Sequence, residues 1–171
     1  MRAVGYRKSL PITDPEALVD LDLPQPEPGP RDLLVKVEAV SVNPVDTKVR
    51  RRAGPEEGGA TVLGWDAAGT VVAAGAEAAG FSTGDAVFYA GDLTRPGTNA
   101  AYHCVDARLV GRKPASLDWA QAAALPLTAI TAWETLFDRL DTEKPVPGAA
   151  PALLIVGGAG GVGSVAIQLA R

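Results

Sequence analysis

The feature that most constrains this chain is a glycine-rich turn near residue 160, because it separates an apolar run from a helical pattern. The run is Ala152 to Val156, five apolar residues that end in isoleucine and valine. Such a run predicts a short strand buried on both faces, as in a parallel sheet. Ser164 to Ala170 has the composition of a packed helix. The segment therefore predicts the order strand, glycine turn, helix.

The glycines have the spacing of a dinucleotide-binding turn, with Gly158, Gly160 and Gly163 in the order G-x-G-x-x-G. Glycine permits a tight turn, a close approach of the backbone to a pyrophosphate, and close packing of the helix on the strand. The helix start adds free N–H groups and the positive end of the helix dipole. A plain loop is the alternative, because a glycine-rich chain also meets this spacing by chance. The acidic residue that would bind the ribose lies about 20 residues further on, beyond Arg171, so NAD and NADP both stay open.

Charge and composition exclude several classes of partner. A net charge of −4 over 171 residues argues against nucleic acid or an anionic membrane as the main partner. No apolar run approaches the length of a transmembrane helix, and strand-like residues rather than a charged leader follow Met1. We therefore expect a cytoplasmic protein. Cys104 is the only cysteine, which excludes disulfides within the chain and argues against a cysteine-based zinc site.

The first part of the chain has the pattern of short strands joined by turns. Residues 33–40 alternate between two faces, with Leu33, Val35, Val37 and Ala39 on one of them, which is the period of a half-buried strand. Further strands are expected over residues 62–73, 84–90 and 101–105, and a loop over residues 91–99. Small residues within 62–73 indicate the close approach of another backbone or a ligand.

Helical segments are expected at three places. Residues 43–50 suit a short helix with Pro44 in its first turn and Asn43 at its cap. Residues 118–125 are alanine-rich, and Leu127, Ile130, Trp133, Phe137 and Leu140 then follow at helical spacing. A proline-rich link over residues 145–151 leads to the final predicted strand.

Five motifs, in this order, resemble the medium-chain dehydrogenase/reductase superfamily. They are NPVD at 43–46, LGWDAAG at 63–69, GDAV at 84–87, AITA at 129–132 and GAGGVG at 158–163. Within the superfamily the chain is similar to zinc-free quinone oxidoreductases and to the zinc-type alcohol dehydrogenase-like group. The resemblance implies a mostly β, GroES-like barrel domain over residues 1–125, then the first β-α unit of a truncated Rossmann α/β domain over residues 126–171. Members run to roughly twice this length, as two domains require, so the chain resembles the N-terminal half of such an enzyme.

The same resemblance implies a metal-free site. A catalytic zinc ion in this superfamily would need a cysteine in the place of Asn43 and a histidine in the place of Trp65, and the four-cysteine structural lobe is missing. His103 and Cys104 cannot replace these ligands, because neighbouring residues of a strand point to opposite faces. We therefore predict no metal.

The resemblance also indicates which residues form the site. Asn43 is expected at the nicotinamide end of a cleft between the two domains, where its amide donates to a substrate carbonyl or holds the cofactor; a helix cap is the structural alternative. Asp46 is expected near the same cleft, with a solvated first-turn acid as its alternative. Thr131 either contacts the cofactor or bonds back to its own helix, and Thr128 lies one turn earlier. The predicted cofactor-binding residues are Thr131, Gly158, Gly160, Gly161, Val162 and Gly163.

Other polar and aromatic residues have plainer explanations. One expectation is that Tyr89, Asn99 and Tyr102 line the substrate side of the site. For the two tyrosines, aromatic packing is an equally good explanation. His103 is expected to satisfy a local hydrogen bond rather than to act as a catalyst. Cys104 is expected to be a small packed residue rather than a nucleophile.

The expected activity is a zinc-independent, NAD(P)H-dependent oxidoreductase that reduces quinones or activated enones by hydride transfer. NADPH is the expected cofactor, NADH is not excluded, and the full-length protein is expected to be a homodimer. Without a metal as Lewis acid, a quinone or enone is the easier substrate because conjugation spreads the incoming charge. The alternatives are an enoyl reductase of the same superfamily and a non-catalytic GroES-like fragment.

Overall fold

The computed structural model describes residues 1–52, 54–55, 59–144, 147–148 and 152–171. These residues form two compact units, Met1–Ala124 and Leu125–Arg171. Most of the proline-rich link expected over residues 145–151 lies outside the described residues. Among the described residues, no helix has the length and apolar character needed to cross a membrane.

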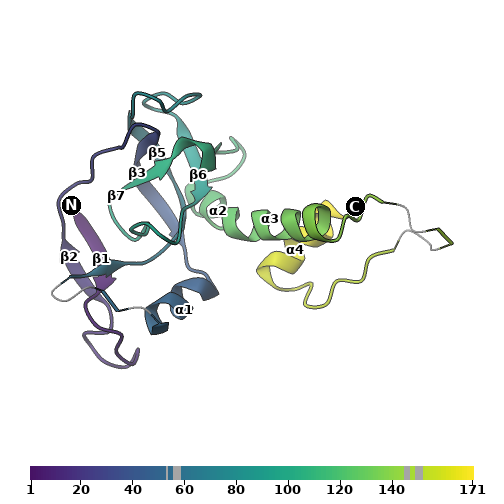
Figure 1. Cartoon of the computed structure of the whole chain (residues 1–171), viewed down its shortest axis with the longest axis horizontal. Helices are drawn as coiled ribbons and strands as arrows, with labels where there is room; N and C mark the ends of the chain where they lie inside the picture. Colours follow the sequence, from purple (N-terminus) through teal and green to yellow (C-terminus); the bar gives the residue numbers. More distant parts are fainter. Residues whose placement is uncertain (53, 56–58, 145–146, 149–151) are drawn as a thin grey trace. The chain divides into compact units, whose positions relative to one another are not determined.

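Two antiparallel sheets make up most of the larger unit (Figure 1). The smaller sheet has the order β2-β1-β4 and consists of β1 (Arg2–Tyr6), β2 (Val19–Asp22) and β4 (Thr61–Val62). The larger sheet has the order β7-β3-β5-β6-β8 and consists of β3 (Asp32–Ser41), β5 (Asp66–Ala74), β6 (Ala86–Ala90), β7 (Tyr102–Asp106) and β8 (Val110–Arg112). The 3-10 helix η1 (Ala107–Leu109) joins the last two strands. This mostly β architecture agrees with the fold class expected from the sequence.

The core of the larger sheet follows the alternation in β3. Leu33 and Val35 are fully buried, together with Val71, Val87 and Val105 from neighbouring strands. The alternation is not strict, because Leu34 of the opposite face is also buried. Two register shifts in the pairing of β3 with β5 interrupt the regular ladder, as β-bulges do.

The sequence predicts one strand, interrupted by small residues, over 62–73; the structure instead divides this segment between β4 and β5, which belong to different sheets. Gly64 has a φ of +93°, a conformation that L side chains rarely adopt, so the chain leaves β4 there and enters β5 in the other sheet. The close backbone approach expected from the small residues is present, because a Cβ on Gly69 would lie 2.2 Å from the Lys36 carbonyl oxygen.

The segment before β7 connects the two sheets. Ala100 forms an isolated antiparallel bridge with Ala3 of β1. The next carbonyl, that of Ala101, accepts a hydrogen bond of 3.0 Å from the N–H of Val37 in β3. The predicted loop over residues 91–99 is confirmed, and it leads directly into this connection.

Two short helices complete the larger unit. Helix α1 (Pro44–Arg52) begins at Pro44 as predicted, since proline is suited to the first helical position. Helix α2 (Trp119–Ala123) begins after a capping box, in which Asp118 accepts from the N–H of Gln121 and the Gln121 side chain accepts from the N–H of Asp118. Its Ala122 and Ala123 pack on Ala68 of β5.

The smaller unit is helical, with α3 (Pro126–Trp133), the π-helix η2 (Glu134–Arg139) and α4 (Gly161–Leu169). Ala132 and Leu136 pack against Ala166, so α3 and α4 bury their small residues against each other. Trp133 remains 54% exposed. The apolar side chains expected at helical spacing therefore do not form one buried face.

The strand expected over Ala152 to Val156 is absent, which corrects that prediction. No described residue of this run is in a strand, and the side chains of Leu154 and Val156 are 88% and 89% exposed. A strand requires a neighbour that pairs with its N–H and C=O groups. The described part of the smaller unit contains only helices, turns and irregular segments, so the run has no such neighbour.

Candidate functional site

The predicted site residue Asn43 lies at the start of α1 and is 8% exposed. Its backbone N–H donates to Oδ2 of Asp46 over 2.6 Å, and its carbonyl oxygen accepts from the N–H of Asp46 over 3.0 Å. The helix start is thus held by the acid of the first turn, which reaches back to the residue before Pro44. Asp46 is 6% exposed, and its Oδ1 atom has no hydrogen-bond partner within the described ranges of the chain.

The side chain of Asn43 turns to β5 instead of capping the helix. Its Nδ2 donates to Oδ2 of Asp66 over 2.9 Å, and Asp66 is fully buried at the first position of β5. The hydroxyl of Thr98, which is also fully buried, donates to the Asp66 carbonyl oxygen over 3.3 Å. The break at Gly64 allows this arrangement, because a Cβ there would lie 2.7 Å from the Thr98 hydroxyl.

Sequence reasoning included Asp66 only as part of the motif LGWDAAG and missed its contact with Asn43. The two residues are 23 positions apart, and a pairing at that distance has no local periodicity. A signal was nevertheless present, since Asp66 stands inside the small and apolar run LGWDAAG. A buried acid in such a run needs donors.

A second polar group in the larger unit is centred on His103. Its Nε2 lies 3.0 Å from the carbonyl oxygen of Pro96, and its Nδ1 lies 3.1 Å from the hydroxyl of Tyr89. A carbonyl oxygen only accepts, so Nε2 carries the proton and the Tyr89 hydroxyl donates to Nδ1. Burial lowers the pKa of His103 to about 4 and raises that of Tyr89 well above its usual value. His103 therefore satisfies a local hydrogen-bond network, as expected.

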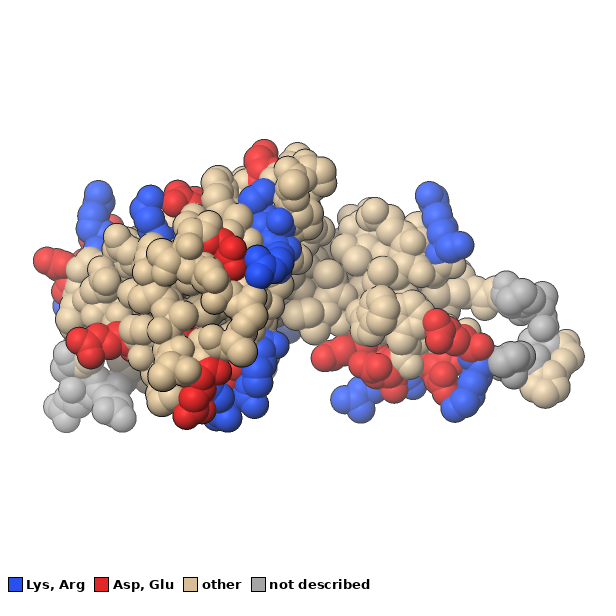
Figure 2. Space-filling model, turned by 90° about the horizontal axis from the view of Figure 1, so that it is seen from above, with Lys and Arg blue, Asp and Glu red and all other residues tan. Residues whose placement is uncertain are grey.

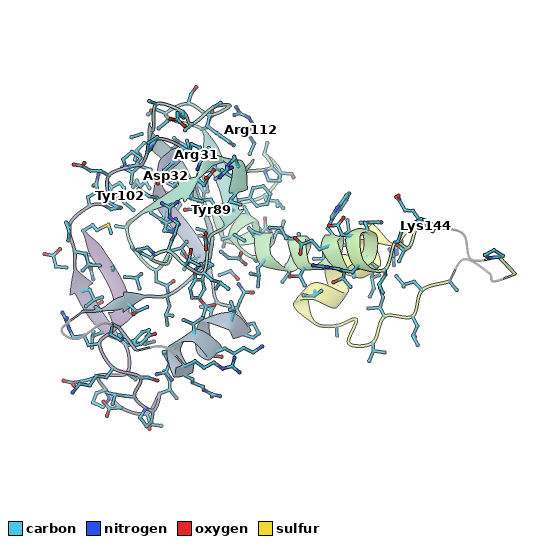
Figure 3. All side chains as sticks on the ribbon, viewed as in Figure 1. Arg31, Asp32, Tyr89, Tyr102, Arg112 and Lys144 are labelled. Atoms are coloured by element: carbon cyan, nitrogen blue, oxygen red, sulfur yellow. The ribbon has the colours of Figure 1, made fainter. Side chains whose placement is uncertain are left out.

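Burial also explains the other residues named for this region. Burial raises the pKa of the half-buried Cys104 thiol to about 11, which argues against a nucleophile. Cys104 lines a surface cavity of about 330 Å³ with Arg95 and Asp106, in the larger unit, where Figure 3 labels Tyr89 and Tyr102. Tyr89 is buried in the core of the large sheet, so packing explains it.

The side chains around Asn43 do not form a ligand set for a zinc ion. The Asn43 amide nitrogen already donates to Asp66, and the Trp65 indole N–H donates to the Asp92 carbonyl oxygen over 2.9 Å. Both nitrogens of His103 are engaged. Among the described residues no group of three or more His, Cys, Asp and Glu side chains is arranged to hold a metal ion, and zinc sites are built from such ligands.

The glycine turn lies in the smaller unit, where it leads into α4. Gly157 has a φ of +78°, and the first intrahelical bond runs from the N–H of Ser164 to the carbonyl oxygen of Gly160 over 2.8 Å. A Cβ on Gly163 would lie 2.4 Å from the Gly157 carbonyl oxygen. Glycine is required there because the helix packs directly on the turn, and this is a property of a dinucleotide-binding turn.

The structure brings part of α3 close to this turn. A Cβ on Gly161 would lie 3.0 Å from Cγ2 of Thr128. The hydroxyl of Thr128 donates to the Leu125 carbonyl oxygen over 2.9 Å, and that of Thr131 to the Leu127 carbonyl oxygen over 2.7 Å. Both threonine hydroxyls thus bond back to their own helix, which was the alternative to a cofactor contact for Thr131. Thr131 itself is exposed.

Comparison with known proteins decides the family. The model of the alcohol dehydrogenase GroES-like domain matches residues 29–124. The chain belongs to this family. The GroES-like domain therefore contains Asn43, Asp46, Asp66 and His103, whereas the glycine turn lies outside the matched residues.

The relatives of this GroES-like protein are oxidoreductases of the medium-chain dehydrogenase/reductase superfamily, including quinone oxidoreductases and an enone reductase. A zinc-type alcohol dehydrogenase-like protein of Staphylococcus epidermidis is 41% identical over all of this chain and 51% of its own length. A crystal structure of a candidate zinc-dependent alcohol dehydrogenase from Rhizobium etli CFN 42 is 64% identical, with a TM-score of 0.97 over 100% of this chain and 50% of that one. The quinone oxidoreductase of Coxiella burnetii is 32% identical, with a TM-score of 0.82 over 99% and 53%.

The GroES-like chain thus spans about half the length of the curated relatives it matches. It covers the N-terminal half of these oxidoreductases. On the face shown in Figure 2, acidic and basic side chains are interspersed over the surface.

Proposed function

We propose that this chain is the N-terminal half of a zinc-independent, NAD(P)H-dependent oxidoreductase that reduces quinones or activated enones by hydride transfer. We further propose a small-molecule substrate, NADPH as the preferred cofactor, a cytoplasmic location and a homodimer of the full-length protein. The observation that carries the proposal is the buried contact of 2.9 Å between Asn43 and Asp66. At position 43, where a metal-dependent relative would need a cysteine ligand, this chain has an amide that is hydrogen-bonded to a carboxylate.

The residues of the smaller unit fit a dinucleotide. A Cβ on Gly158 would lie 2.9 Å from Cδ1 of Ile167, and a Cβ on Gly160 or Gly163 would lie 3.3 or 2.4 Å from the Gly157 carbonyl oxygen. The start of α4 offers N–H groups for a pyrophosphate. When bound, a nicotinamide cofactor supplies the hydride, and the protein supplies binding, orientation and the electrostatic environment. We propose that Gly161, Val162 and Thr131 take part in holding it.

The charges around Asn43 favour a role in holding the cofactor over a role in donating to the substrate oxygen. Asp46 accepts from the backbone of Asn43, and Asp66 accepts from its side chain. Two carboxylates repel an oxygen that becomes negative during reduction, and attract the positive charge that hydride loss leaves on a nicotinamide ring. These charges support the proposal that Asn43 and Asp46 act beside the cofactor.

One alternative shares the cofactor and the fold. An enoyl reductase would act on the carbon–carbon double bond of a ketone or thioester, and the presence of an enone reductase among the relatives favours keeping this candidate. A non-catalytic role for the GroES-like unit is the second alternative.

The test uses the full-length protein with NADPH or NADH and a panel of quinones, enones, unsaturated thioesters and secondary alcohols, with and without EDTA. We expect quinone or enone reduction that the chelator leaves unchanged. Turnover confined to thioesters would favour the enoyl reductase. Alcohol oxidation that EDTA abolishes would contradict the proposal, and failure to bind either cofactor in calorimetry would favour the non-catalytic role.

A further inference from the structure

The contact between Asn43 and Asp66 determines which way the amide of Asn43 points. A carboxylate oxygen only accepts hydrogen bonds, so the atom of the amide that lies 2.9 Å from Oδ2 of Asp66 has to be Nδ2. The usual ambiguity between the oxygen and nitrogen of an asparagine side chain is therefore removed. The carbonyl oxygen Oδ1 of Asn43 faces away from Asp66.

Asn43 and Asp46 each carry an acceptor oxygen to which no described group donates. Within the described part of the chain no group donates to Oδ1 of Asn43. Oδ1 of Asp46 is buried and has no hydrogen-bond partner among the residues that the structure describes. A buried oxygen without a donor costs about 1–3 kcal/mol. This cost applies to Oδ1 of Asp46, and Oδ1 of Asn43 is an acceptor near it in the sequence, so a ligand group that donates a hydrogen bond can satisfy either oxygen.

We infer that Asp66 is a positioning residue, which turns Nδ2 of Asn43 toward the protein so that Oδ1 is presented to an N–H or O–H donor of the ligand. This inference rests on the proposed function, within which the carboxamide N–H of the nicotinamide is the matching donor. In this role Asp66 acts through Asn43 and does not itself contact the ligand. The site then recognises a donor instead of stabilising an oxyanion.

An exchange of the two side chains tests this inference in the full-length protein. Asn43→Asp alone places two carboxylates at a contact of 2.9 Å, and we expect the melting temperature to fall by at least about 5 °C. The double variant Asn43→Asp/Asp66→Asn restores a donor opposite a carboxylate, with the roles of the two positions reversed. Position 43 still presents an acceptor oxygen to the ligand.

The matched control combines Asn43→Asp with Asp22→Asn. Asp22 is an exposed acid whose side chain is 94% accessible, so this variant has the same net charge as the exchange without restoring the pair. We expect its melting temperature to stay low. A fourth variant, Asp66→Asn alone, lets the Asn43 amide turn over, and we expect NADPH binding to weaken by about tenfold, the equivalent of one hydrogen bond.

Calorimetric Kd values for NADPH separate the two roles of Asn43. If Asn43 presents an acceptor, the exchange restores both the melting temperature and the Kd to within about threefold of the wild type. If the exchange restores the melting temperature but leaves binding about tenfold weaker, Asn43 acts as a donor and the inference is wrong. An exchange that fails to restore the melting temperature contradicts the pairing itself. Should the wild type bind no nicotinamide cofactor, the proposed function fails, and the melting temperatures still decide whether Asp66 positions Asn43.

Discussion

His103 is expected to make the stability of the larger unit depend on pH. Burial lowers its pKa from 6.5 to about 4, so the folded domain keeps the imidazole neutral in a range where the unfolded chain binds a proton. As the pH decreases, the free energy of unfolding falls wherever the unfolded state binds more protons than the folded state. The neutral His103 therefore makes its full contribution to stability above pH 6.5, and this contribution is lost as the pH falls from 6.5 toward 4.

The magnitude follows from the size of the shift. One pKa unit corresponds to about 1.4 kcal/mol, so a change from 6.5 to about 4 lowers the free energy of unfolding by about 3 kcal/mol. The guanidinium of Arg95 lowers the pKa of Asp32 below its usual 3.8. The contribution of this carboxylate is present above its unfolded pKa and is lost only at a lower pH, so it adds little within the window of His103.

Urea denaturation between pH 7 and pH 4 measures this effect, in the wild type beside His103→Leu. The variant loses the contacts with Pro96 and Tyr89 and is less stable at every pH, but its stability should change much less over the window. His103 is the only histidine, so its titration can be followed by NMR without assignment. An imidazole that titrates near 6.5 in the folded protein, or an equal pH dependence in the variant, would refute the reasoning.

Three further substitutions or reactions have expected outcomes. Gly69→Ala should lower the free energy of unfolding by about 2 kcal/mol or more, because its Cβ would meet the Lys36 carbonyl oxygen at 2.2 Å; an unchanged urea midpoint would contradict this. Asp118→Ala removes the capping box with Gln121 and should cost about 1 kcal/mol, measured in the same way. Cys104 should react slowly with iodoacetamide at pH 7 and faster as the pH approaches 11, because burial raises its thiol pKa to about 11; rapid alkylation at pH 7 would argue against its burial.

Features that depend on local chemistry could be predicted from the sequence. The start of α1 follows from the preference of proline for the first helical turn. The position of β3 follows from its alternating pattern. The close approach at Gly69 follows from small residues inside a strand. In each case, the residues that cause the feature lie within a few positions of it.

Features that depend on distant partners could not be predicted in this way. The run at 152–156 has the composition of a strand, but a strand also requires a paired neighbour, which composition does not supply. Gly64 divides the segment 62–73 through a positive φ, which many glycines in the chain do not have. Asn43 was a predicted site residue, yet its orientation depends on Asp66 in another element, and only the fold brings the two together.

The exposed run that contains Leu154 and Val156 has a practical consequence for handling the chain. Their side chains are 88% and 89% exposed, and residues 152–156 carry neither a charge nor a proline. Exposed segments that are uncharged and apolar are the usual starting points of intermolecular β-pairing. In concentrated solution we therefore expect copies of this 171-residue chain to associate through this segment and to precipitate. A single Lys substitution at position 154 should extend its shelf life without disturbing the GroES-like unit.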